Sequence, residues 1–281
     1  MENLMARNFI SKNLRHSPLT ILLLTVSCFS LNAQVLKPIS SIKLKSNVNQ
    51  VSIDRQGYIY VAASNGDVDR LDGDGTITKH FSPTKRATPS LIEAWQGLRV
   101  FVFYQDFQEY LFLDRFLAPS ERYSLTNQRL SSTVSLSSIA ADDNIWVFDS
   151  QNLSLKKIDI QNGEMLFETN LNFILKNKRH NFTYIREYQN LLFLSDKNEG
   201  ILVFDNIGNY LETLPLLDVD FFSFNDTRLL TLKANKLITF EIYDKEKKEV
   251  SLTDPSYNFV LMENKRVFLF AKNRLDIFEM N

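Results

Sequence analysis

The stretch GYIYVAASNGDVDRLDGDG, residues 57–75, decides between two interpretations of the chain. Its end, Asp72–Gly75, resembles the beginning of a calcium loop, whereas the part before it holds two apolar runs around the polar turn Ser64–Asp67. An EF-hand loop requires Gly at its sixth position and Glu at its twelfth. Counted from Asp72, these positions hold Ile77 and Pro83. Because Gly and Asp are also the residues of tight turns, the stretch predicts strand, turn, strand and a second turn.

The same unit recurs along the chain. Apolar runs like Ile59–Val61 return at spacings of 38 to 46 residues, at Val100–Phe103, Ile145–Phe148, Leu191–Leu194, Leu229–Leu232 and Val267–Phe270. Before each run lie another apolar stretch and a polar turn, and after it a second turn and a third strand. A mean spacing of about 42 residues is typical of a four-stranded propeller blade. No segment has the sustained 3.6-residue apolar period of a helix.

The number of units indicates how the ring closes. Five units have a fourth strand, and the sixth stops at Asn281 after three. The unpaired segment Ile39–Lys45 supplies the missing strand. We therefore predict an all-β fold, a six-bladed β-propeller, in which this N-terminal strand pairs with Leu275–Phe278 of the last blade. Such closure removes sheet edges that would otherwise pair with other chains.

The first 33 residues have the pattern of a targeting segment. Basic residues at Arg7, Lys12 and Arg15 precede the apolar run from Leu19 to Leu31, which is the order found in a secretory signal peptide. We predict signal peptide 1–33 with cleavage after Ala33, a single propeller domain at 34–281, and a periplasmic location without a membrane span in the mature chain. The alternative is a lipid anchor through Cys28, the only cysteine.

Composition excludes several classes of function. The 32 Lys and Arg balance 33 Asp and Glu, which argues against nucleic acid as a partner. The mature chain would lack a thiol, His80 and His180 lie in different blades, and there is no G-x-S-x-G nucleophile motif. We therefore predict that the protein is not an enzyme and that it has no catalytic residue, metal or cofactor.

Some residues remain candidates for binding. Glu93 is the only acid in the expected inner strands, and one carboxylate does not hold calcium, which takes 6–8 oxygen ligands. We expect Glu93 to pair with Arg186 or water. The candidates for the channel mouth are Glu93, Asp142 and Arg186; those for an interface are Phe107 and Tyr110, which flank a turn, and the basic residues Lys176, Lys178 and Arg179.

The unit resembles NHL-type and WD-type propeller repeats, in which a strand that ends in Asp is followed by a Gly turn, as at Asp72-Gly73. The resemblance covers residues 39–281, although no unit has the Trp-Asp pair of WD repeats. The Asn-Ala-Gln signal end and the cysteine-free propeller resemble Gram-negative envelope proteins. In size and layout the chain is similar to the periplasmic plug proteins of the type 9 secretion translocon. This similarity implies a non-catalytic interaction module with an outer-membrane barrel as its partner. The alternative is a small-molecule-binding, glycan-binding or lactonase-like propeller that uses the central channel.

Overall fold

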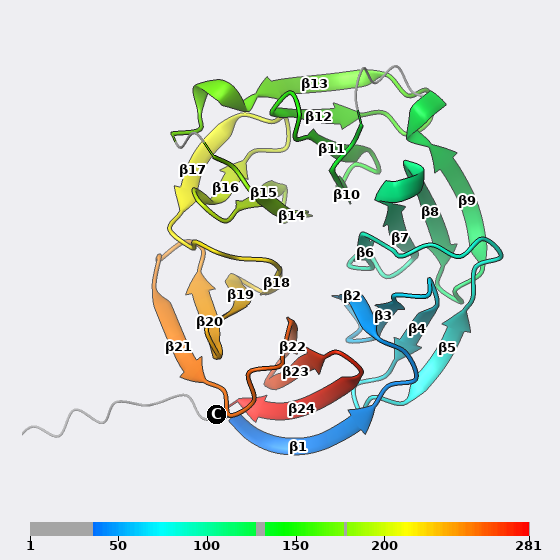
Figure 1. The fold of residues 1–281 in the computed structure, drawn as a ribbon, viewed down its shortest axis with the longest axis vertical. Helices are drawn as coiled ribbons and strands as arrows, with labels where there is room; N and C mark the ends of the chain where they lie inside the picture. Colours follow the sequence, from blue (N-terminus) through cyan, green and yellow to red (C-terminus); the bar gives the residue numbers. More distant parts are fainter. Residues whose placement is uncertain (1–35, 128–132, 177–178, 281) are drawn as a thin grey trace, which may run out of the picture. The chain divides into compact units, whose positions relative to one another are not determined.

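Six antiparallel sheets, each of four strands, make up the computed structural model, which describes residues 36–127, 133–176 and 179–280. The sheets are arranged as the blades of a ring (Figure 1). The fold is the six-bladed β-propeller that the repeat predicts. Helical structure in the described residues is confined to the 3-10 turns η1 (Gln105–Phe107), η2 (Leu125–Asn127) and η3 (Leu171–Phe173). None of the helical segments in these ranges is long and apolar enough to cross a membrane.

Each blade runs from an inner strand to an outer strand. The inner strands are β2 (Val48–Ile53), β6 (Leu91–Glu93), β10 (Leu136–Ile139), β14 (Phe182–Tyr188), β18 (Phe222–Asn225) and β22 (Phe259–Glu263). The second strands are β3 (Ile59–Ala63), β7 (Arg99–Tyr104), β11 (Ile145–Asp149), β15 (Leu191–Asp196), β19 (Arg228–Lys233) and β23 (Arg266–Ala271). The third strands are β4 (Val68–Leu71), β8 (Glu109–Asp114), β12 (Ser154–Ile158), β16 (Gly200–Phe204), β20 (Lys236–Glu241) and β24 (Arg274–Met280). The outer strands are β5 (Ile77–Phe81), β9 (Pro119–Ser124), β13 (Met165–Asn170), β17 (Tyr210–Leu214), β21 (Lys247–Ser251) and β1 (Leu36–Lys43).

The ring closes between the two ends of the described chain, as predicted. Strand β1 pairs antiparallel with β24, from Leu36 opposite Met280 to Lys43 opposite Arg274, with a register shift between Pro38 and Ser40. The N-terminal strand thus becomes the outer strand of the last blade. Residues 1–35 lie outside the described ranges, and with them the predicted signal peptide and Cys28.

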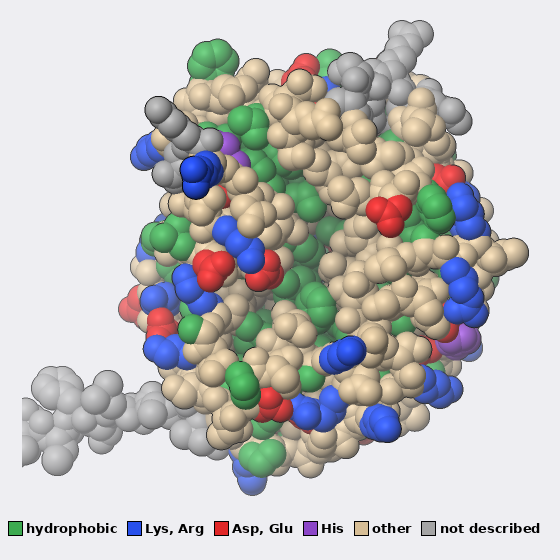
Figure 2. Space-filling view, viewed as in Figure 1, with side chains coloured by type: hydrophobic (Ala, Val, Ile, Leu, Met, Phe, Trp, Pro, Cys, Tyr) green, Lys and Arg blue, Asp and Glu red, His purple; other side chains and the backbone are tan. Residues whose placement is uncertain are grey.

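Burial explains why the second and third strands are apolar runs instead of alternating patterns. Every residue of β3, β11 and β16 is buried, because both faces of a blade pack against neighbouring blades. Large rings fill the wedges between blades: Tyr188 of one blade stacks on Phe224 of the next at 4.4 Å. On the face drawn in Figure 2, the centre of the ring is hollowed and hydrophobic side chains lie in the hollow.

The segment Asp72–Gly75 forms the turn between β4 and β5, as predicted. The Asp72 Oδ1 atom accepts hydrogen bonds from the backbone N–H groups of Asp74 (3.0 Å) and Thr76 (2.9 Å). Gly75 has a φ of +83°, a conformation that glycine adopts without strain. Asp114, the last residue of β8, and Asp205, which follows β16, each accept hydrogen bonds from two backbone N–H groups in the same way. The aspartates of this repeat therefore stabilise turns.

The boundaries of two inner strands correct one expectation. Strand β14 continues to Tyr188 and β22 to Glu263. Glu93 is therefore not the only acid on an inner strand, because these two strands include Glu187 and Glu263. Tyr188 at the end of β14 is buried against Phe224, and the pairing of β22 with β23 continues to Glu263 opposite Arg266.

Candidate functional site

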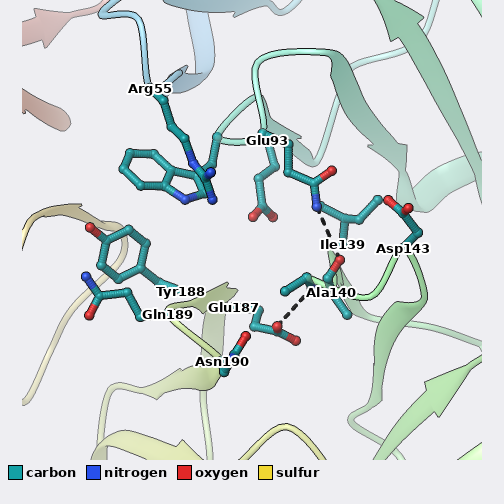
Figure 3. A pocket seen from close by; sticks show the side chains of 12 residues that line it. Arg55, Glu93, Ile139, Ala140, Asp143, Glu187, Tyr188, Gln189 and Asn190 are labelled. Carbon is teal, nitrogen blue, oxygen red and sulfur yellow. Dashed lines mark hydrogen bonds between the residues drawn. The ribbon is translucent and has the colours of Figure 1, made fainter.

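A pocket of about 470 Å³ lies where the inner strands of neighbouring blades end. Its walls are the ends of β6, β10 and β14 and the turns that follow them, and Arg55 from the β2–β3 turn completes it. We call it the mouth pocket (Figure 3). Because the corresponding turns of different blades meet here, residues about one repeat apart in sequence come together.

Glu93 points its carboxylate into the mouth pocket (Figure 3). Only 5 % of this residue is exposed. The Ser138 hydroxyl donates to Oε2 at 2.9 Å, and Arg186 Nε lies 3.9 Å from Oε1. Burial raises the pKa of Glu93 to about 7, against the opposing effect of the Arg186 charge. A carboxyl group with this pKa changes its protonation near neutral pH.

Arg186 is buried beside Glu93, with 2 % of its surface exposed. Its Nε atom has no hydrogen-bond partner within the described part of the chain. At 3.9 Å the two side chains attract each other by charge, but the separation is too long for a hydrogen bond. The structure therefore brings Glu93 and Arg186 together and leaves one donor of the arginine unsatisfied.

Glu187 is a second buried carboxylate on the pocket wall. Its Oε1 accepts the Ala141 N–H at 2.9 Å and its Oε2 accepts the Trp146 indole N–H. The backbone N–H of Glu187 donates to the same Ser138 hydroxyl that donates to Glu93. Ser138 of the third blade thus joins carboxylate-bearing strands of the second and fourth blades and fixes their relative position.

Aromatic rings form another wall. Trp95 and Tyr188 meet edge to face with ring centres 5.0 Å apart. The Arg55 guanidinium lies 5.4 Å from the centre of the Trp95 ring. Because Tyr188 also stacks on Phe224 at an interplanar angle of 3°, its ring is held from behind. Because only 3 % of Tyr188 is exposed, the ring surface that this wall presents next to charged and amide groups comes mainly from half-buried Trp95.

Asp142, the third residue predicted for the channel mouth, is not among the residues that line the pocket. Its carboxylate pairs with Lys157 Nζ at 2.6 Å. Burial favours a higher pKa for Asp142, but the hydrogen bond and charge of Lys157 outweigh it and lower the pKa. Its neighbour Asp143 lines the pocket instead and pairs with Arg99 at 2.5 Å.

The predicted interface residues have different environments. Tyr110, a candidate for an interface, is fully buried and is not available as a surface contact, because its ring stacks on Tyr123 at 5.0 Å and packs against Phe101. Phe107 is half-buried beneath Lys85, whose Nζ lies 3.5 Å from the ring centre.

The basic connection between the third and fourth blades is exposed where it is described. Lys176 and Arg179 face solvent, whereas Lys178 lies outside the described residues. The Lys176 backbone N–H donates to Glu199, and the Arg179 carbonyl accepts from Asn198. These two hydrogen bonds involve backbone atoms of Lys176 and Arg179, and not their charged side chains.

An apolar surface that sequence reasoning missed lies on the outer strands of the third and fourth blades. We call it the apolar rim; it consists of Met165, Leu166, Phe167, Ile207, Tyr210 and Leu211, all at least 39 % exposed. The two blades touch here, because the Thr169 hydroxyl donates to the Gly208 carbonyl at 2.7 Å. The sequence does contain a sign of this surface. The outer strands β13 and β17 begin with the apolar residues MLF and YL, whereas the other outer strands carry Lys, Arg or proline.

No metal centre is indicated within the described ranges, where no group of three or more His, Cys, Asp or Glu is placed to hold an ion. The two histidines of the propeller each contact a single carboxylate, His80 with Asp69 and His180 with Asp196. These pairs lie in different blades.

Comparison with known proteins supports the fold. No protein-family model and no curated protein matches the chain. Among solved structures, virginiamycin B lyase from Staphylococcus aureus is similar at 13 % identity with a TM-score of 0.58, over 88 % of this chain and 99 % of that one. BamB from Moraxella catarrhalis is similar at 12 % identity and a TM-score of 0.50, over 87 % and 98 % of the two chains. A streptogramin B lyase is similar at 16 % identity and a TM-score of 0.57, over 88 % and 97 %. At such identities the likeness establishes the propeller fold alone.

Proposed function

We propose that the protein is an exported, non-catalytic interaction module of the cell envelope, and that a partner protein adds an extended segment to the outer edge of β13. The observation that carries this proposal is the composition of the outer strands. Four of them contain Lys, Arg or Pro, whereas β13 (MLFETN) and β17 (YLETL) contain none.

The edge of β13 is suited to pair with another strand. It is the last strand of its sheet, so one row of its backbone groups has no strand partner among the described residues. Soluble proteins usually protect such edges with Lys, Pro or charge. Strand β13 has no Lys or Pro, one charged residue, Glu168, and a register shift between Met165 and Phe167. Its apolar part is the kind of edge on which peptide recognition by strand addition works, with backbone hydrogen bonds for affinity and side-chain contacts for specificity.

Charge indicates the chemistry of the partner segment. The charged residues of β13 and β17 are the acids Glu168 and Glu212, and Glu164 precedes β13 in the turn. Because Glu168 pairs with Lys156 at 3.4 Å and Glu212 pairs with Lys245 at 2.5 Å, both acids are already compensated, and an extended segment of mainly apolar residues would match the apolar rim. Lys176 and Arg179, which are exposed in the next connection, are the candidates for a second, acidic contact.

Binding, and not catalysis, is also favoured by the state of the acids in the mouth pocket. Asp143 is paired with Arg99, and both oxygens of Glu187 accept hydrogen bonds. These contacts hold Asp143 and Glu187 in the walls of the pocket, which supports a structural role for the two side chains.

The cellular partner that we propose is an outer-membrane barrel. Its support is the similarity in size and layout to the plug proteins of the type 9 secretion translocon and the signal peptide predicted for residues 1–33.

The test compares two matched variants in pull-downs of the tagged protein from mild-detergent extracts of the host envelope. Leu166→Lys places a charge on the apolar rim, and Ile77→Lys places one on the outer strand of the first blade; the two residues are 40 % and 37 % exposed. Wild type and Ile77→Lys should retain a stoichiometric partner that Leu166→Lys loses, and cross-links should map the contact to β13.

Three results would oppose the proposal. They are capture of the partner by Leu166→Lys as well as by wild type, cross-links that avoid β13, and light scattering showing that the species on the rim is a second copy of the chain. Far-UV circular dichroism of both variants shows whether the fold is retained. If Leu166→Lys unfolds, Leu211→Lys on β17 makes the same comparison.

A further inference from the structure

We propose that the mouth pocket binds a neutral saccharide of mono- to disaccharide size, with Glu93 and the side-chain amides as its hydrogen-bonding groups and Trp95 and Tyr188 as its apolar wall. This site is separate from the apolar rim, and the proposal does not depend on the interaction module.

The charges around the pocket favour a neutral ligand. Glu93, Asp143 and Glu187 line it, and Arg55 lines it as well. Two more arginines contact these acids, Arg99 at 2.5 Å from Asp143 and Arg186 at 3.9 Å from Glu93. Three acids therefore face three arginines. A strongly anionic or cationic ligand would meet an unfavourable neighbour, whereas a neutral one would not.

The uncharged polar groups suit hydroxyls. Gln96, Gln189 and Asn190 line the pocket, and each side-chain amide offers both donors and an acceptor. A sugar hydroxyl is likewise donor and acceptor at once, so neighbouring hydroxyls of one ring are matched by neighbouring amide and carboxyl groups. Gln189 and Asn190 are exposed, and the Gln189 Oε1 atom accepts a 3.5 Å hydrogen bond from the Tyr243 hydroxyl, which a ligand hydroxyl would replace.

Glu93 lines the pocket, and Arg186, which does not line it, lies beside Glu93 with a buried donor that a water molecule or a ligand hydroxyl would satisfy. Arg186 Nε is a buried donor without a hydrogen-bond partner in the described chain, and it lies 3.9 Å from Glu93 Oε1. A ligand hydroxyl next to Oε1 would accept a hydrogen bond from Arg186 Nε and donate one to the Glu93 carboxylate. A metal ion or a simple ammonium group cannot accept a hydrogen bond and would leave Arg186 unsatisfied.

Size and the aromatic wall complete the match. A cavity of about 470 Å³ falls in the range of small-ligand pockets. Sugar rings carry apolar C–H faces as well as hydroxyls, and half-buried Trp95, which the buried Tyr188 ring supports edge to face, offers ring surface beside the polar groups. Arg55 lies over Trp95 from an exposed turn position, so it can move aside or cap the ligand.

The experiment is saturation-transfer-difference NMR of the purified protein with glucose, galactose, N-acetylglucosamine and their disaccharides cellobiose, lactose and chitobiose. Calorimetry then gives the dissociation constant of any sugar that binds. Trp95→Ala and Gln189→Ala are the site variants. Phe116→Ala, which removes an exposed aromatic ring from the β8–β9 turn, is the control.

We expect at least one sugar to bind, with affinity about 10-fold lower in Trp95→Ala and Gln189→Ala and unchanged in Phe116→Ala. The proposal is overturned if no sugar binds at about 10 mM, if the site variants bind as wild type does, or if spermidine or citrate binds at the site in preference to every sugar. Gln189 is exposed, so its variant keeps the test decisive should Trp95→Ala fail to fold.

Discussion

Replacement of Glu93 by Gln should change how the stability of the protein depends on pH. Burial raises the pKa of Glu93 from its ordinary 4.5 to about 7. The folded state therefore holds this proton more tightly than the unfolded state. The stability that the protonated carboxyl contributes is fully present below pH 4.5 and is lost as the pH rises through 7.

The magnitude follows from the size of the shift. A rise from 4.5 to about 7, at about 1.4 kcal/mol per unit, corresponds to about 3 kcal/mol of unfolding free energy. Glutamine does not titrate. Relative to wild type, Glu93→Gln should therefore become more stable by about 3 kcal/mol between pH 4.5 and pH 8, whatever constant offset arises from the altered contacts with Ser138 and Arg186.

Urea unfolding followed by the fluorescence of Trp95 and Trp146 gives both free energies at each pH. Glu164→Gln, which removes a carboxylate from an exposed turn, is the matched control. The quantity to compare is the difference between variant and wild type as a function of pH. A difference for Glu93→Gln that stays constant from pH 4.5 to pH 8 would refute the buried, pKa-shifted carboxyl.

Three further predictions concern the scaffold. Gly200→Ala should cost about 2–3 kcal/mol in urea unfolding, because φ is +114° and the new Cβ would lie 2.3 Å from the Leu214 carbonyl oxygen. Gly97→Ala is the control: at φ +74° no atom lies within 4 Å of the new Cβ, so this substitution should cost about 1 kcal/mol of unfolding free energy. Equal losses in the two variants would argue against the clash at Gly200. Trp146→Phe should cost about 2 kcal/mol in the same assay, because the buried Glu187 carboxylate loses its indole donor; a loss near zero would contradict this role. Removal of residues through Lys43 should expose the β24 edge and give concentration-dependent oligomers in light scattering, whereas a stable monomer would speak against closure by β1.

The exposure of the residues proposed for an interface could be predicted from the sequence only in part. Tyr110 follows a turn and was therefore a candidate for an interface, yet the rings of Phe101 and Tyr123 enclose it. Turn proximity says where the backbone reverses, but whether a side chain next to the turn points into the wedge between blades depends on the strand register. Conversely, Met165, Leu166 and Phe167 look like core residues in sequence and are exposed, because β13 is the last strand of its sheet.

The sequence by itself determined the repeat, the six blades and the closure by the N-terminal strand. It could do so because strands and turns are local features, and apolar runs such as Ile59–Val61 and turns such as Asp72–Gly75 recur at one spacing. The mouth pocket was decided only by the tertiary structure. Arg55, Trp95, Glu187 and Tyr188 come from three different blades, and they meet because the ring brings corresponding turns to one place. The raised pKa of Glu93 has the same origin, since desolvation is a property of the packed environment and cannot be assigned to an isolated residue.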